Sequence, residues 1–277
     1  MKRLAILGSL ALAAAGPIAA WGQFLPDEIA RRSVLEEFLR TAKIARFEEI
    51  GEGVTKPYKL YLKKDGIELA AAWKDPKGMQ LGYLEGWQYE IAAYRLDKLI
   101  GLDMIPPTVE RDFRGKPGAL VLWAENKYSL MKITQGGIPI PEEASDRTEK
   151  MRWLILAWDS LIANEDRTQQ NILFTEDWRV IIFDHSRAFR SGSAFTKQLM
   201  YGRDGIRRTP SGDPLIFGRL PRWFVDKIKA LTFENIRAAV GSTLTAKEIK
   251  AILARRDILL REIGEMVKER GEAAVLY

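Results

Sequence analysis

The chain has 277 residues, 47% of them hydrophobic and 29% charged, which is enough for a sizeable core and argues against disorder over most of its length. Its 43 Lys and Arg residues against 37 Asp and Glu give a net charge of +6, a mild excess that suits anionic ligands but is also common without them. There is no cysteine and a single histidine, His185. Disulfides, thiolate metal sites and cysteine nucleophiles are therefore excluded, and a His-rich metal site or a Ser-His-Asp triad has little support.

Residues 1–22 have the layout of a bacterial secretory signal peptide. Two basic residues precede an apolar, uncharged stretch, and small residues stand at the positions that a signal peptidase requires before Gln23. Gly16 and Pro17 interrupt the stretch, which disfavours a stable membrane-spanning helix. We therefore predict an exported protein, periplasmic or secreted, with no stable membrane span after cleavage; an uncleaved membrane anchor is the alternative.

The spacing of apolar residues predicts the elements of the first part of the chain. Residues 26–46 are expected to form one helix, because apolar residues recur there at helical spacing. Alternating apolar and polar residues over 47–75, with an Asp-Gly hairpin turn at 65–66, predict two or three antiparallel strands that end at Lys74. A second helix is expected over 85–100.

A further hairpin and a long helix are predicted next. Strands are expected over 108–113 and 119–124, with the turn at 115–118. A largely buried helix is expected over 146–163. Two short strands at 171–174 and 180–183 follow it.

The last third of the chain is expected to be mainly helical. Residues 190–218 are rich in Gly, Ser, Pro and Arg and predict a long surface segment. Thr232 is a candidate N-cap for a helix over 233–240. A capping box that begins at Thr245 predicts another helix, which runs to about residue 268.

The order of these elements predicts the fold class. A sheet with one helix comes first and mostly helix follows, which is typical of an α+β fold built in two parts. We place the first part at residues 23–125 and the second at residues 126–277.

Three oxygen-bearing side chains flank the short hairpin of the second part. Asp166 and Asn171 precede its first strand, and Asp184 follows its second strand. Because the outer ends of a two-stranded hairpin lie together, we expect these side chains to converge. Carboxylate and amide oxygens suit Mg²⁺ or Mn²⁺, and phosphoryl transfer from a nucleotide needs such a cluster.

The segment from Asp159 to Phe189 resembles the catalytic region of the atypical kinases, namely the phosphatidylinositol 3- and 4-kinases and the casein-kinase-type kinases of the secretory pathway. In those families it looks like D-x-x-I-x-N-x-D-R-x-x-x-N, followed by I-D-[NH]-[GS]-x-A-F. The matching positions here are Asp159, Ile162, Asn164, Asp166, Arg167, Asn171, Asp184, Ala188 and Phe189.

The resemblance implies a two-lobed, protein-kinase-like fold with a small β-rich N-lobe and a mostly helical C-lobe. It implies that Asp166 is the catalytic-loop acid, that Asn171 and Asp184 are metal ligands, and that the cofactors are ATP with Mg²⁺ or Mn²⁺. The match covers about thirty residues. It departs from ordinary protein kinases, because Asp184-His185-Ser186 replaces Asp-Phe-Gly and no histidine precedes Asp166.

The first part of the chain offers the cation that bound phosphates need. Lys74 ends an apolar strand, and Glu90 lies near the apolar face of the next helix, so an ion pair between them explains both positions. Gly51 and Gly53 are candidates for a phosphate-covering turn. Simpler roles remain open: a solvated Lys74, a surface Glu90, and ordinary turn glycines.

These residues favour a phosphotransferase that uses ATP and a hydroxyl acceptor of unknown identity, with no nucleic-acid partner expected. A nucleotide-binding pseudokinase without turnover is the main alternative, because ATP is scarce outside the cytoplasm. Transfer of AMP, or a metal-dependent nuclease or phosphatase, also remains open. The null hypothesis for Asp166 and Asn171 is that they are ordinary loop and cap residues.

Overall fold

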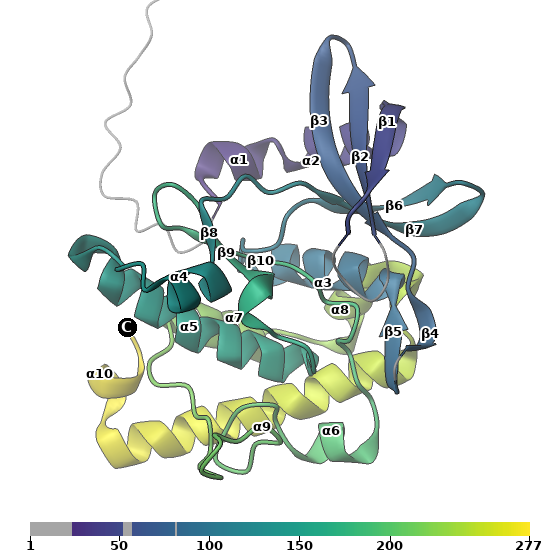
Figure 1. Ribbon diagram of the computed structural model, residues 1–277. Helices are drawn as coiled ribbons and strands as arrows, with labels where there is room; N and C mark the ends of the chain where they lie inside the picture. Colours follow the sequence, from purple (N-terminus) through teal and green to yellow (C-terminus); the bar gives the residue numbers. More distant parts are fainter. Residues whose placement is uncertain (1–23, 52–56, 81) are drawn as a thin grey trace, which may run out of the picture.

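The computed structural model describes residues 24–51, 57–80 and 82–277. The predicted signal peptide therefore lies outside the described residues. Strands gather at one end of the molecule and most helices at the other (Figure 1), in agreement with the expected α+β class. The helices of the first half are α1 (Pro26–Ala30), α2 (Arg32–Thr41), α3 (Trp87–Ile100) and α4 (Leu130–Gly136).

The larger sheet is antiparallel and has the strand order β1-β2-β3-β7-β6. Its strands are β1 (Lys43–Glu49), β2 (Tyr58–Lys64), β3 (Ile67–Lys74), β6 (Thr108–Phe113) and β7 (Lys116–Leu122). The predicted turn at Asp65-Gly66 joins β2 to β3, and both residues have positive φ, as a tight two-residue hairpin requires. Leu60 and Leu62 alternate with more exposed neighbours and are buried against α2.

Two predicted boundaries in this region are wrong. The helix expected over 26–46 breaks at Arg31 and ends at Thr41, where Arg111 donates hydrogen bonds to the carbonyls of Leu39 and Ala42. Residues from 43 onward form β1 instead, because pairing with β2 overrides their helical spacing.

The hairpin of β6 and β7 also turns earlier than expected. Arg114 and Gly115 take positive φ and form the turn by themselves. Lys116 therefore already pairs with Phe113, and the strand begins three residues before the predicted start at 119.

A small hairpin between β3 and α3 was not predicted. It consists of β4 (Lys77–Gln80) and β5 (Tyr83–Gly86), which pair with each other only. Its sequence has too few apolar residues in alternation to predict strands. Figure 1 shows it hanging from the sheet toward the helical part.

The helical part packs around helix α5 (Glu142–Ile162), which is largely buried from Met151 onward and was predicted to begin at residue 146. Thr232 and Thr245 are N-caps, as predicted. The remaining helices are the single-turn η1 (Gln169–Asn171) and η2 (Gly241–Thr243), with α6 (Ser193–Lys197), α7 (Arg222–Lys229), α8 (Phe233–Val240), α9 (Ala246–Arg270) and α10 (Glu272–Val275). None of the helices in the described ranges is both long and apolar enough to span a bilayer.

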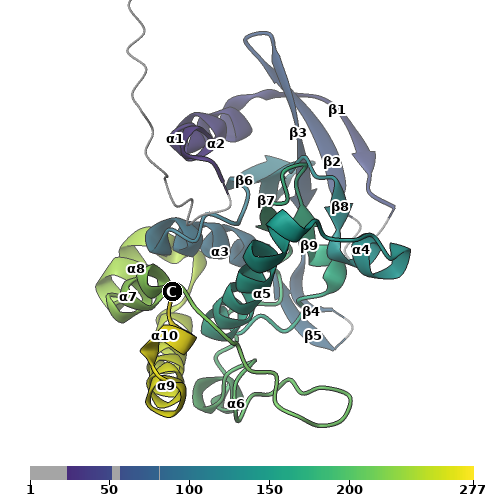
Figure 2. The same ribbon diagram turned by 90° about the vertical axis from the view of Figure 1, so that its left-hand side faces the viewer.

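Helix α3 connects the two parts. It contacts β6 and β7 on one side and α8 on the other, and most of its apolar residues belong to the core of the helical part. A three-stranded sheet lies between α5 and the larger sheet (Figures 1 and 2), in the order β10-β9-β8. Its strands are β8 (Tyr128–Ser129), β9 (Ile172–Phe174) and β10 (Val180–Ile182).

A buried arginine ties the long helix α9 to the loops around α5. Arg255 donates hydrogen bonds to the carbonyls of Leu161, Arg190 and Phe195 at 2.7–3.0 Å. Burial lowers its pKa to about 9. The end of α5 and the segment after Phe189 are therefore held against one helix.

The packing of the larger sheet gives a first prediction. A Cβ at Gly118 would lie 2.6–2.7 Å from the ring of Trp73, so we expect Gly118→Ala to destabilise the protein by about 1–3 kcal/mol. Gly264, inside α9, has nothing within 4 Å of its Cβ position, so Gly264→Ala should stabilise by about 0.5–1 kcal/mol. Urea unfolding of both variants measures the change in the free energy of unfolding. Changes of the same sign and size in the two variants would contradict the packing argument.

Candidate active site

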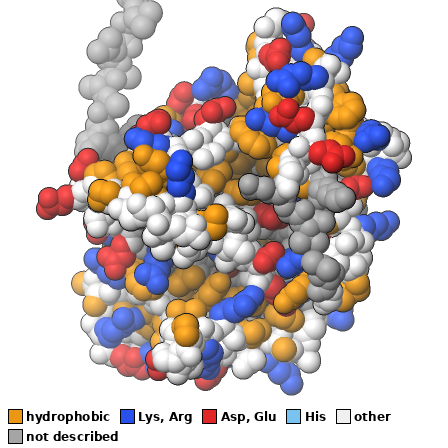
Figure 3. Space-filling model, in the orientation of Figure 1, with side chains coloured by type: hydrophobic (Ala, Val, Ile, Leu, Met, Phe, Trp, Pro, Cys, Tyr) orange, Lys and Arg blue, Asp and Glu red, His pale blue; other side chains and the backbone are white. Residues whose placement is uncertain are grey.

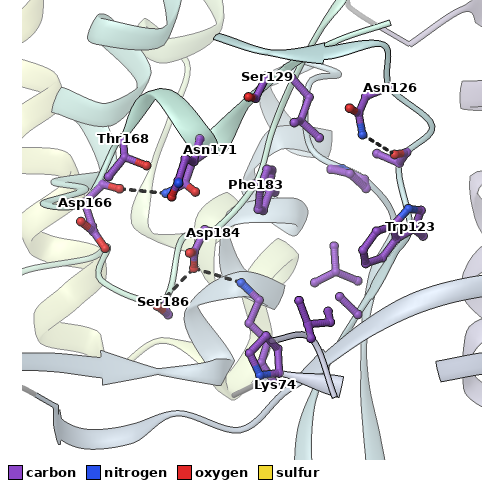
Figure 4. A pocket seen from close by; sticks show the side chains of 18 of the residues that line it. Lys74, Trp123, Asn126, Ser129, Asp166, Thr168, Asn171, Phe183, Asp184 and Ser186 are labelled. Atoms are coloured by element: carbon purple, nitrogen blue, oxygen red, sulfur yellow. Dashed lines mark hydrogen bonds and ion pairs between the residues drawn. The ribbon is translucent and has the colours of Figure 1, made fainter. Parts of the chain in front are cut away.

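The hairpin of β9 and β10 brings its outer ends together, as predicted. Ile172 pairs with Ile182, and the backbone N–H of Phe183 donates to the carbonyl of Asn171 at 3.3 Å. The Asn171 amide in turn donates to the backbone carbonyl of Asp166 at 3.1 Å. Asp184, directly after Phe183, faces the same cavity. Figure 4 shows Asp166 and Asn171 on one side of this cavity, with Asp184 between them and Lys74; the volume of the cavity is about 530 Å³.

The loop that carries Asp166 is fixed by a buried ion pair. Arg167 contacts both oxygens of Asp159 at 2.9 and 3.0 Å and also donates to the carbonyl of Phe183 at 2.7 Å. Asn164 donates to Asp159 at 3.1 Å. These residues match the kinase pattern, and their contacts are structural: they hold the loop to the end of α5 and to the hairpin.

Lys74 and Glu90 form the ion pair that the sequence suggested. The Lys74 ammonium lies 2.7 Å from Glu90 Oε1 and 3.0 Å from Asp184 Oδ1. Burial by itself would lower the pKa of Lys74, but the charges of Asp184 and Glu90 outweigh it and raise the pKa. Burial would likewise raise the pKa of Glu90, but Lys74 and His185 hold it well below its usual range. Both side chains are therefore charged at neutral pH.

His185 is a packed residue. Its backbone N–H donates to Glu90 Oε2 at 3.0 Å, and its Nε2 lies 2.9 Å from an Arg167 Nη atom. Burial, together with the charge of Arg167, lowers its pKa despite the nearby Glu90 carboxylate. A neutral ring accepts the hydrogen bond from Arg167, so His185 connects the loop support to the Lys74 ion pair.

Gly51 and Gly53 receive no support as phosphate contacts. Gly53 lies outside the described residues. Gly51 is exposed and is not among the described residues that line the cavity, although its neighbour Ile50 is. Ile50 donates a backbone hydrogen bond to Pro57 at 2.8 Å, so the two ends of this turn meet at the cavity rim.

Sequence reasoning missed Glu85 and Arg187, which also line the cavity. The guanidinium of Arg187 lies 2.7 Å from Glu85 and 3.2 Å from Asp166 Oδ2. Arg187 occupies the variable position of the kinase pattern, so the pattern carried no information about it. Glu85 stands five residues before Glu90, and nothing in its local sequence marks it as buried.

The cavity has an apolar end and a charged end. Ala72, Val121, Trp123 and Leu173 are among the residues that line the apolar end. The ion pairs at the charged end join two cations to four carboxylates: Lys74 and Arg187 to Glu85, Glu90, Asp166 and Asp184. These ion pairs leave two negative charges uncompensated. Figure 3 shows acidic and basic side chains side by side in the hollow between the two parts of the molecule.

Burial raises the pKa of Asp166, whose side chain is partly exposed. The negative charges of Asp184 and Glu85 add to this rise, while Arg187 opposes it. A carboxylate with a raised pKa is a better proton acceptor than an ordinary aspartate.

No family model matches the sequence, and no curated protein is similar to it. Solved structures do share its fold. The structure of hydra Fam20 with sugar aligns with a TM-score of 0.60 and 15% identity, over 94% of this chain and 95% of that one. The Golgi casein kinase with Mn and ADP bound aligns with a TM-score of 0.62 and 16% identity, over 93% and 80%. A Helicobacter pylori proinflammatory kinase, CtkA, aligns with a TM-score of 0.54 and 12% identity, over 84% and 96%.

The chain therefore has a two-lobed, kinase-like α+β fold of the Fam20 type. This confirms the predicted fold class and the casein-kinase side of the resemblance. The resemblance to the phosphatidylinositol kinases stays a prediction. At 12–16% identity the likeness concerns the fold alone.

The buried ion pair gives a stability prediction. Lys74→Met leaves the Glu90 carboxylate buried without its cation, so we expect a loss of about 3–5 kcal/mol in the free energy of unfolding. The double variant Lys74→Met with Glu90→Gln should recover part of this loss. Urea unfolding at pH 7 measures both, and a Lys74→Met variant as stable as wild type would show that Glu90 does not depend on the ammonium.

The pH dependence of that loss follows from the lowered pKa of Glu90. In the wild type, a carboxylate with a lowered native pKa stabilises the fold above its unfolded pKa of about 4.3 and loses this effect as the pH falls further. In Lys74→Met, burial without the cation raises the pKa of Glu90, so protonation of Glu90 removes the cost of the buried, unpaired charge. The stability gap between the two proteins should therefore shrink from pH 7 to pH 5, and a constant gap would contradict it.

Proposed function

We propose that this protein is a phosphotransferase that uses ATP with Mg²⁺ or Mn²⁺ to phosphorylate a hydroxyl acceptor. The observation that carries the proposal is the position of the Lys74 ammonium, which lies between Glu90 and Asp184 at the charged end of a cavity large enough for a nucleotide. An ammonium on a strand, held by a helix carboxylate, is the arrangement that kinases use to bind phosphates. The Mn and ADP in the Golgi casein kinase structure support the same ligands here.

The residues that would coordinate a divalent cation are Asn171 and Asp184. None of the described residues donates a hydrogen bond to Asn171 Oδ1 or to Asp184 Oδ2, so these oxygens are available, and the surplus of negative charge favours a cation. Within the described ranges, no three His, Cys, Asp or Glu side chains could hold a metal on their own. Phosphate oxygens would complete the coordination, which suits Mg²⁺. The metal, once bound, would neutralise phosphate charge during transfer.

The other residues then take complementary roles. Lys74, positioned by Glu90, would contact the α and β phosphates, and Asp166 would accept the proton of the acceptor hydroxyl. The adenine would lie at the apolar end, near Ala72 and Trp123. The nucleotide would thus lie between residues 23–125 and residues 126–277, the two lobes predicted from the sequence.

Nucleotide binding tests the proposal first. We expect Mg-ATP or Mn-ATP to bind the wild-type protein in isothermal titration, and Asp184→Ala to weaken binding at least tenfold because a metal ligand is lost. Asp226→Ala, which removes an exposed carboxylate on α7, is the matched control and should bind like wild type. Absence of binding by the wild type, or equal binding by Asp184→Ala, would refute the proposal.

Turnover separates an active enzyme from a pseudokinase. Asp166→Asn should keep nucleotide binding within about threefold but reduce transfer of the γ-phosphate by about 10²–10⁴-fold, because the base is lost. The measurement is labelling of the protein itself or of an extract with γ-³²P-ATP. Nucleotide binding without any label in the wild type would favour a pseudokinase, and label from α-³²P-ATP would favour AMP transfer.

Export remains a proposal that rests on residues 1–22. We expect the protein from a bacterial envelope fraction to begin at Gln23, after cleavage of the signal peptide. N-terminal sequencing of the purified protein checks this. A chain that retains residues 1–22 in the membrane fraction would instead support the anchor.

A further inference from the structure

Arg187 bridges two carboxylates that line the cavity, Glu85 and Asp166. Its Nε and Nη2 both lie close to Glu85 Oε1, at 2.8 and 2.7 Å, while its Nη1 lies 3.2 Å from Asp166 Oδ2. The guanidinium is largely buried and also stacks over the ring of Tyr83 at 4.5 Å. One cation is therefore shared between a carboxylate of the N-terminal part and the carboxylate proposed as the base.

The ion pair of Arg187 with Glu85 is buried and is held in place by the small hairpin. Tyr83 and Glu85 alternate along β5, so both side chains point to the same face of the small hairpin, where Arg187 lies. The next residue, Gly86, donates a backbone hydrogen bond to the carbonyl of Ser186 at 3.0 Å, which fastens the hairpin to the segment that carries Arg187. The Glu85 side chain is only 3% exposed, so this ion pair is shielded from water.

The contact with Asp166 is the exchangeable one. It is longer, it uses a single nitrogen, and the Asp166 side chain is 37% exposed. Ion pairs with exposed partners contribute little to stability, because water replaces them at low cost. The Nη1 group can therefore leave Asp166 while Nε and Nη2 stay on Glu85.

Arg187 also lies where the terminal phosphate of a nucleotide would end. Figure 4 shows Trp123 on one side of the cavity, Lys74 and Asp184 in the middle, and Asp166 on the opposite side. If the adenine ring lies at the apolar end and the α and β phosphates lie at Lys74, the γ-phosphate points toward Asp166. Among the described residues, the cation in contact with the Asp166 carboxylate is Arg187, through Nη1. A guanidinium is well suited to a phosphate oxygen.

We propose that Arg187 senses the γ-phosphate: it pairs with Asp166 when no triphosphate is bound and moves its Nη1 to a γ-phosphate oxygen when ATP binds, while Glu85 keeps the rest of the guanidinium in place. This rests on the proposed phosphotransferase function. Release of Asp166 then coincides with the presence of a transferable group. The acceptor oxygen forms a bond to the γ-phosphorus, the bond to the β-phosphate oxygen breaks, ADP leaves, and the acceptor proton passes to Asp166.

The test compares the affinities for Mg-ATP and Mg-ADP, because Mg-ADP lacks the group that Arg187 is proposed to contact. We expect Arg187→Ala to weaken Mg-ATP about tenfold or more and to change Mg-ADP by less than threefold. Arg187→Lys should likewise lose most of the preference for Mg-ATP over Mg-ADP, because a single ammonium cannot hold Glu85 and a phosphate together. Arg203→Ala is the matched control, since it removes an arginine that pairs with Glu269 on an exposed surface.

The outcomes are distinct. Equal losses for both nucleotides, or an unchanged preference in both Arg187 variants, would overturn the inference, because Arg187 would then only hold the hairpin in place. If Arg187→Ala does not fold, Arg187→Lys keeps the positive charge and decides the question. A wild type that binds neither nucleotide would instead overturn the proposed function itself, and the inference with it.

Discussion

The arrangement of the whole cavity depends on the Lys74 ammonium. It joins three elements from different parts of the chain: strand β3, which carries Lys74 itself, helix α3 through Glu90, and the segment after β10 through Asp184. A buried ammonium needs nearby carboxylates, and these carboxylates need the ammonium, so each side chain fixes the others. The relative position of the sheet and the helical part at the cavity is therefore set by charge as well as by apolar packing.

A second network supports this one from the helical side. Arg167 holds the loop of Asp166 to α5, and His185 connects Arg167 to Glu90. The network is buried and nearly every charge in it has a partner, which favours one well-defined geometry over several. Such rigidity is what a site needs if it is to hold a phosphate chain and an acceptor in line.

Local rules predicted two features of the site: the convergence of Asp166, Asn171 and Asp184, and the pairing of Lys74 with Glu90. The roles of other residues between Asp159 and Phe189 were implied by the resemblance to the atypical kinases. A short hairpin must bring its outer ends together, and Lys74 in an apolar strand must find a carboxylate. The hairpin of β4 and β5 could not be predicted, since Lys77-Gly-Met-Gln80 has weak alternation and little apolar surface. Arg187 and Glu85 escaped notice because they meet only through the tertiary fold, 102 positions apart in the sequence. The first residues of β1, 43–46, were predicted as helix, because pairing with β2, a non-local interaction, decides their conformation.

The hairpin of β4 and β5 is an excursion of the chain whose two ends lie side by side. It lies between Lys74 and Glu90 in the sequence. At its base, the backbone N–H of Trp87 donates a hydrogen bond to the carbonyl of Pro76 at 2.8 Å. Lengthening a loop whose ends are already joined costs little entropy, because the cost grows only slowly with loop length. The tip of this hairpin can therefore change in length without moving the Lys74 ammonium, provided that Glu85 and Gly86 keep their contacts with Arg187 and Ser186. Insertions at the tip would then alter the surface around Tyr83 while the charged groups inside the cavity keep their positions.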